Sequence, residues 1–214
     1  MTTTHLYPSI PEEIANSITH GVGAVLSIVG IVFLLIAAIT RGTALHIVGV
    51  AVFGATLILL YLASTLYHAL TPHRVKRVFQ IFDHSAIYFL IAGTYTPFTL
   101  ITLRGVWGWS LFTVIWSLAV LGVVFKSIWI DRHAVLSTAV YVLMGWCAIV
   151  VIRPLLHGLP WDGFLWLLAG GLSYTAGVIF YASHRRYAHA VWHLFVLGGS
   201  ACHYWAIYRY VIPS

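Results

Sequence analysis

Seven apolar stretches alternate with short polar breaks along the 214 residues of this chain. A helix needs about 20 apolar residues to cross the hydrocarbon core of a bilayer, and each stretch reaches that length. Backbone amides in lipid must bond within their own segment, so runs this long predict helices rather than the strands of a barrel. The predicted spans are residues 17–39, 44–69, 81–102, 107–129, 134–156, 161–182 and 187–211.

The breaks between these spans leave no room for a soluble domain. Arg41-Gly42, Pro72, Arg104-Gly105 and Asp131-Arg132 mark four of them. Connections this short force neighbouring helices to run antiparallel. We therefore predict an all-α fold, in which residues 1–214 form one seven-helix integral membrane domain.

Two local features predict how the helices meet. The small residues Gly21, Gly23 and Gly30 allow close approach of a neighbouring helix along the first span. Pro97, inside the third span, lacks a backbone donor and should kink the helix there.

Composition agrees with a membrane protein and excludes a water-soluble one. The chain is 61% hydrophobic and 7% charged, with a mean hydropathy of +0.94. The net charge of +6 comes from basic residues scattered singly through the loops rather than gathered in a stripe. That distribution argues against a nucleic acid partner and for the lipid bilayer as the surroundings.

The basic residues also predict the orientation of the bundle. If the spans alternate in direction, seven fall on the side of the N-terminus and four on the other. The seven are Arg74, Lys76, Arg77, Lys126, Arg132, Arg185 and Arg186, and the four are Arg41, Arg104, Arg153 and Arg209. Because loops rich in Lys and Arg stay inside, the N-terminus is predicted to be cytoplasmic and the C-terminus to lie on the opposite side. The expected location is the plasma membrane, in a bacterium the inner membrane.

Polar and ionisable side chains gather at the ends of four spans, although such groups are costly in a membrane. They are Glu13, Asn16 and His20 in the first span, Ser64 and His68 in the second, Asp83 and His84 in the third, and His189 and His193 in the seventh. With the N-terminus inside, all four span ends lie at the same membrane depth. This agreement favours a shared polar cavity.

Three histidines at that depth predict a metal site. His189 and His193 are four residues apart and share one helix face, and His68 ends a second span. Three neutral imidazoles with an open fourth position are typical of catalytic zinc. The carboxylate of Asp83 and a bound hydroxide would neutralise the ion, so Asp83 is a candidate base and Ser64 a candidate hydrogen-bond anchor for the metal-bound water.

The remaining polar residues have more than one interpretation. Glu13 and Asn16 either cap the first helix, or orient a metal ligand, or pair with a loop arginine. His20 belongs to the same stripe and could line the cavity. His203 lies about 15 Å beyond His193 along the helix, too far to bind the same ion, so it either lines the cavity or bonds another helix.

Three motifs together resemble one known family. They are Glu13-Ile-Ala-Asn16-Ser-Ile-Thr19-His20, then Ser64-Thr-Leu-Tyr-His68 followed by Asp83-His84, and His189-Ala-Val-Trp-His193 with the later His203. In this order they resemble the progestin and adipoQ receptor family, in particular its short bacterial branch, the hemolysin III or membrane-homeostasis proteins. The resemblance covers nearly the whole chain.

The resemblance implies seven helices, a cytoplasmic N-terminus and a zinc ion near the cytoplasmic face. It implies His68, His189 and His193 as metal ligands, with Ser64 and Asp83 around the metal-bound water. The broader group of membrane hydrolases to which this family belongs includes alkaline ceramidases. A ceramidase-like activity on a lipid amide is therefore an implied function.

Three functional hypotheses follow. The first is a zinc-dependent intramembrane hydrolase of a lipid amide or ester, which contributes to membrane lipid homeostasis. The second is a non-enzymatic membrane sensor whose zinc ties the second, third and seventh spans together. The third is a hemolysin-like pore, which the apolar outer halves of the spans disfavour. A retinal protein is excluded, because it needs a lysine within a span, whereas Lys76 lies in a predicted loop and Lys126 at a span end.

Overall fold

The computed structural model describes residues 9–130 and 134–214, and within them the chain is almost entirely helical, with no strand. The break at Asp131-Arg132 and the first eight residues lie outside the described part. The α-helices are α1 (Ile10–Arg41), α2 (Ala44–Ala69), α3 (His73–Pro97), α4 (Gly105–Ile128), α5 (Ala134–Gly145), α6 (Ile152–Gly158), α7 (Trp161–Tyr181) and α8 (Ala188–Ala206). Two π-helical segments, η1 (Phe98–Leu103) and η3 (Ile207–Val211), and one 3₁₀ segment, η2 (Trp146–Val151), complete them.

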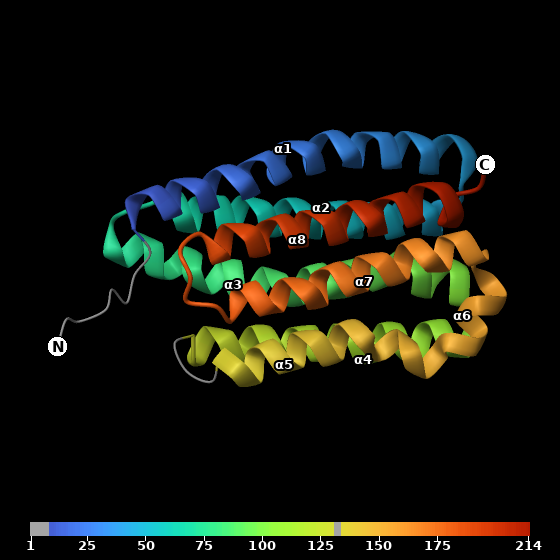
Figure 1. Cartoon of the computed structure of the whole chain (residues 1–214). Coiled ribbons are helices and arrows are strands. Elements are labelled where there is room, and N and C mark those ends of the chain that lie inside the picture. The colour runs from blue at the N-terminus through green and yellow to red at the C-terminus, as the bar shows by residue number, and fades with distance from the viewer. Residues whose placement is uncertain (1–8, 131–133) are drawn as a thin grey trace.

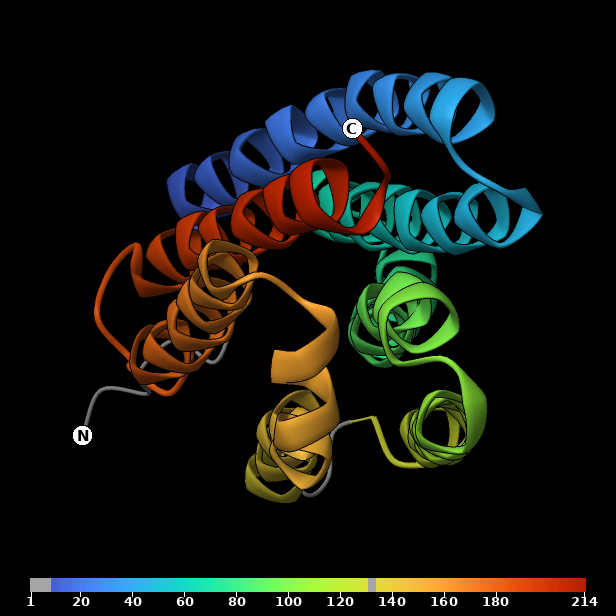
Figure 2. The same ribbon diagram turned by 90° about the vertical axis from the view of Figure 1, so that its right-hand side faces the viewer.

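These elements form seven antiparallel rods, as the sequence predicts (Figure 1). The segment η1 extends α3, η3 extends α8, and α5, η2 and α6 together make the fifth rod. Viewed along the bundle, the rods form a ring in which α8 packs against α1 and α7, and α2 packs against α1 and α3 (Figure 2). The helix α1 begins at one end of the bundle and η3 ends at the other, and the cytoplasmic position of the N-terminus stays a prediction.

Six of the rods in the described residues are long and apolar enough to cross a membrane. The exception is α8, because His189, His193 and His203 lower the apolarity of its 19 residues. It nevertheless runs alongside α1 and α7 through the bundle (Figure 1). The chain is thus a multi-pass membrane protein, and α8 is its seventh span.

Two helices begin earlier than the apolar pattern predicts. The first starts at Ile10 rather than at residue 17. At this start the carboxylate of Glu12 accepts hydrogen bonds from the backbone N–H (2.9 Å) and the hydroxyl (2.6 Å) of Ser9. The N-cap is Ser9, so Asn16 lies within α1 and does not cap it, whereas Glu13 lies in the first turn, where an acid suits the helix dipole. The third span starts at His73 rather than at 81, since its first turns are helical but polar.

The third span changes its helix type at its predicted kink. Pro97 ends the α-helical part, and the wider π-helical η1 follows directly. Pro97 has no N–H to continue the α-helical ladder. The hydroxyl of Thr99 donates to the carbonyl of Tyr95 (3.1 Å), which also accepts a hydrogen bond from the backbone N–H of Phe98.

The fifth span contains a break that the sequence analysis did not predict. After Gly145 the helix tightens into η2. The hydroxyl of Tyr95, on α3, donates to the carbonyl of Gly145 (2.7 Å) and accepts from the backbone N–H of Ala148 (2.9 Å). One side chain from another helix thus stabilises the break.

The close approach of helices at Gly23 gives a stability prediction. A Cβ atom there would lie 2.8 Å from side-chain atoms of both Tyr61 and Leu197, whereas one at Gly21 would make an ordinary 3.6 Å contact with Thr65. We expect Gly23→Ala to lower the free energy of unfolding by about 1–3 kcal/mol through overpacking. The matched control Gly21→Ala should be neutral or stabilise by up to about 1 kcal/mol. Thermal unfolding in detergent measures both, and equal midpoints would contradict the packing argument.

Candidate metal centre

Three histidines meet at the end of the bundle where α2 ends and α8 begins (Figure 1). One ring nitrogen from each of His68, His189 and His193 lies within 4.8 Å of the other two. The ring centroids are 4.6 Å apart for His189 and His193, and the ring of His68 lies 5.1 and 5.3 Å from them. Residues more than 120 positions apart in sequence thus converge, as the shared membrane depth of the span ends predicts.

The free nitrogens of these rings suit a metal ion. The Nε2 atoms of His68, His189 and His193 are all buried and have no hydrogen-bond partner. Leaving one buried polar group unpaired costs about 1–3 kcal/mol. Three unpaired nitrogens close together are therefore consistent with a single ion that binds all three. Nitrogens bound tetrahedrally to zinc lie about 3.4 Å apart, so side-chain movements of about an ångström would close the group around an ion.

The other ring nitrogen of His68 is held by an acid from α1. Its Nδ1 lies 2.5 Å from Oε2 of Glu13, whose Oε1 accepts a hydrogen bond from Nζ of Lys76 (2.8 Å). A hydrogen on Nδ1 leaves Nε2 as the bare acceptor, which is the tautomer that binds a metal. Carboxylates in this position orient metal-binding histidines and raise their basicity. Glu13 therefore orients a candidate ligand and pairs with a lysine on α3, not with a loop arginine.

The ring of His193 is fixed by the same stretch of α1. Its Nδ1 lies 3.2 Å from the backbone carbonyl of Asn16 and 3.0 Å from the hydroxyl of Thr19. A carbonyl only accepts, so Nδ1 donates and Nε2 is again the bare nitrogen. The ring of His20 stacks on that of His193, with centroids 3.4 Å apart and an angle of 13° between the planes.

Two further predicted residues, Ser64 and Asp83, are buried, and neither belongs to the group of possible metal ligands in the described residues. Ser64 sits one turn before His68 on the same face of α2, and its hydroxyl is buried without a partner. Asp83 is 4% exposed and lies outside the three-histidine group, with Oδ2 3.8 Å from Nδ1 of His84. The roles of Ser64 and Asp83 stay predictions.

The sequence analysis missed Lys76, which it assigned to a loop. A signal for the earlier helix start was available, because Val75, Phe79 and Phe82 recur at helical spacing before residue 83. Extending the helix back over them would have placed Lys76 next to the ends of the first two spans. Nothing in the sequence indicates that Lys76 pairs with Glu13 rather than with a lipid headgroup.

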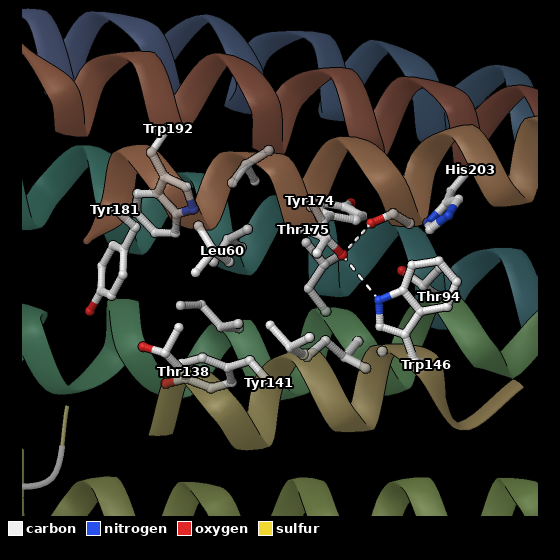
Figure 3. A pocket seen from close by; sticks show the side chains of 18 of the residues that line it. Leu60, Thr94, Thr138, Tyr141, Trp146, Tyr174, Thr175, Tyr181, Trp192 and His203 are labelled. Carbon is white, nitrogen blue, oxygen red and sulfur yellow. Dashed lines mark hydrogen bonds between the residues drawn. The ribbon is translucent and has the colours of Figure 1, made fainter. Parts of the chain in front are cut away.

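An apolar cavity of about 140 Å³ runs along the bundle (Figure 3), and one of its lining residues, His20, stacks on His193 of the histidine group. It lies between α2, α3, α5, α7 and α8, and His20 lines the end next to His193. Tyr181 and Trp192 lie toward that end, and Trp146 and His203 toward the other. His203 also bonds the carbonyl of Leu167 on α7 through Nε2 (3.0 Å), so it both lines the cavity and contacts another helix.

Fold and site together define a multi-pass helical membrane protein with a buried three-histidine group that could hold a metal. Residues 9–204 match the family described as Haemolysin-III related, and the chain belongs to this family. It is 50% identical to Hemolysin-3 of Bacillus cereus, over 99% of this chain and 97% of that protein. It is 48% identical to the Hemolysin-3 homolog of Bacillus subtilis, over 95% and 96% of the two chains.

A more distant relative is human. The chain is 29% identical to the Monocyte to macrophage differentiation factor of Homo sapiens, over 97% of this chain and 87% of that protein. These similarities support the expected resemblance to the progestin and adipoQ receptor family.

The hydrogen bond between Glu13 and His68 gives a prediction for metal binding. We expect Glu13→Gln to weaken zinc binding about 10- to 100-fold, because the amide orients the ring less strongly and lowers its basicity. Competition with a chromogenic chelator measures the affinity. Glu12→Gln is the matched control, because Glu12 bonds Ser9 and the backbone N–H of Tyr187 (3.1 Å) instead of a histidine. Equal affinities of the two variants would contradict the role of Glu13.

Proposed function

We propose that this protein is a zinc-dependent hydrolase of a lipid amide or ester that contributes to membrane lipid homeostasis. The observation that carries this proposal is the convergence of three unpartnered Nε2 atoms beside an apolar cavity. His20 connects the two, since it stacks on His193 and lines the cavity. A lipid with its chain in the cavity would present its carbonyl to the histidines.

The lining of the cavity supports a lipid substrate. Its walls are mainly aliphatic and aromatic side chains, such as Leu60, Ile87 and Trp192, with few polar groups. An apolar pocket with a few convergent polar groups is typical of a ligand site. Its position between spans suits an acyl chain that arrives from the bilayer.

The proposed chemistry assigns a task to each polar residue. A zinc ion held by His68, His189 and His193 would polarise the carbonyl and make a water molecule more acidic. Asp83 takes a proton from that water while the oxygen of the water bonds to the carbonyl carbon of the lipid. Asp83 then returns the proton to the leaving nitrogen or oxygen as the amide or ester bond breaks. The unpartnered hydroxyl of Ser64 holds the attacking water in position.

Metal content tests the first part of the proposal. We expect about one zinc per chain in the wild type and loss of most of it in His68→Ala and in His193→Ala, because each substitution removes one of three ligands. Elemental analysis of the purified protein in detergent gives the stoichiometry. His157→Ala is the matched control, since His157 is exposed on α6. The same zinc content in all four proteins would rule out this ligand set.

Turnover tests the second part. We expect zinc-loaded wild type to release fatty acid from at least one member of a panel of ceramides, N-acyl amides and acyl esters. Asp83→Asn should lower turnover about 10²- to 10⁴-fold with zinc content unchanged, because it removes the proton acceptor. Mass spectrometry of the released fatty acids measures the turnover of the wild type and of Asp83→Asn. No zinc-dependent product across the panel would count against hydrolysis.

A structural role for the metal is the second candidate, and one observation favours it. The three histidines come from α2 and α8, and residues of α1 hold two of their rings. An ion there would tie spans from both ends of the chain, and metal binding would then stabilise the fold. In that case His68→Ala lowers the unfolding temperature, whereas Asp83→Asn leaves the cellular phenotype intact. The Asp83→Asn variant therefore separates the two candidates.

A further inference from the structure

The end of the cavity remote from the metal centre holds another unpartnered histidine nitrogen. His203 is 7% exposed, and its Nε2 bonds the carbonyl of Leu167 (3.0 Å). Because a carbonyl only accepts, Nε2 carries the hydrogen, and Nδ1 of the neutral ring is an acceptor. This Nδ1 is buried and has no hydrogen-bond partner.

The other edge of the ring packs against α7. A Cβ atom at Gly170 of α7 would overlap Cδ2 and Nε2 of His203, so this edge of the ring lies directly against the backbone of α7. Nδ1 is on the opposite edge of the ring, away from α7. His203 lines the cavity, where it lies on the same side as Trp146 and Thr94 (Figure 3).

Several polar groups near His203 are engaged with one another, whereas the hydroxyl of Thr94 also lines the cavity. The hydroxyls of Tyr61 and Tyr174 both bond Oγ of Ser200, at 2.7 and 2.8 Å. Nε1 of Trp146 donates to the hydroxyl of Thr175 (3.0 Å; Figure 3). Nδ1 of His203 is therefore left as an acceptor that a ligand can use.

We propose that the cavity binds a lipid whose acyl chain carries a hydroxyl near its middle, and that this hydroxyl donates a hydrogen bond to Nδ1 of His203. The inference rests on the proposed function in that the carbonyl of the same lipid lies at the histidine group. His193 and His203 are ten residues apart on α8, which separates the two polar ends by about 15 Å. The twelfth carbon of an extended acyl chain lies at a comparable distance from its carbonyl.

Ricinoleic and oleic acid are matched probes, because they differ only by a hydroxyl on the twelfth carbon. Both are free acids, so their binding does not depend on turnover. We expect the full-length, zinc-loaded protein in detergent to bind ricinoleic acid about tenfold more tightly, since the hydroxyl satisfies a buried acceptor. Isothermal titration calorimetry measures the two affinities.

Variants assign the preference to His203. His203→Phe keeps an aromatic ring but has no acceptor, so the buried hydroxyl loses its partner, and we expect oleic acid to bind as tightly as ricinoleic acid or more tightly. His203→Gln keeps an acceptor oxygen and should retain part of the preference. Cys202→Ala, a change at the adjacent position outside the cavity lining, should retain all of it. If His203→Phe does not fold, Gly170→Ala displaces the ring without removing it and should abolish the preference.

The outcomes separate this inference from the proposed function. Equal affinities of the wild type for the two acids would overturn the role of His203 and leave an acyl-binding cavity in place. Binding of neither acid would overturn both proposals. A preference that His203→Phe leaves unchanged would show that another group recognises the hydroxyl and would overturn the assignment.

Discussion

The carboxylate of Glu13, bonded to His68 on one side and to Lys76 on the other, is the interaction on which this end of the molecule depends. It joins the first turns of α1 to the end of α2 and the start of α3. An unpaired charge is costly within a membrane protein, so the acid, the imidazole and the ammonium are stable there only together. The same turns of α1 also hold His193 of α8 through Asn16 and Thr19. One short stretch of α1 thus orients rings from two other helices.

The helix α8 links this centre to the remainder of the cavity. It carries two of the three histidines of the group at its start and His203 near its end. Because a helix is stiff, the distance between the two polar ends is set by ten residues of regular backbone rather than by loops. The cavity between them is apolar, so polar recognition is confined to its ends. A ligand that reaches both polar ends must therefore match the distance between them.

The apolar pattern predicted the seven spans and their directions, and the depth of the polar residues predicted that His68, His189 and His193 would meet. The same pattern failed where a helix continues beyond its apolar part, as at Ile10 and His73. It failed again at η2, because the hydroxyl of Tyr95 that stabilises this break comes from a different helix. The sequence also could not predict which ring nitrogen of His203 is an acceptor, because the tautomer depends on the carbonyl of Leu167 on another helix. In each case the deciding partner is distant in sequence.

The low apolarity of α8 has a consequence for biogenesis. A segment with three histidines gains little free energy from lipid alone, whereas the six preceding rods are apolar enough to insert by themselves. Insertion of the last span therefore relies on α1 and α7, which leave the ribosome first. Docking of α8 against them is also the step that brings His189 and His193 to His68. A chain that stalls before this step lacks the three-histidine group, so the candidate metal site forms only with the assembly of the last span.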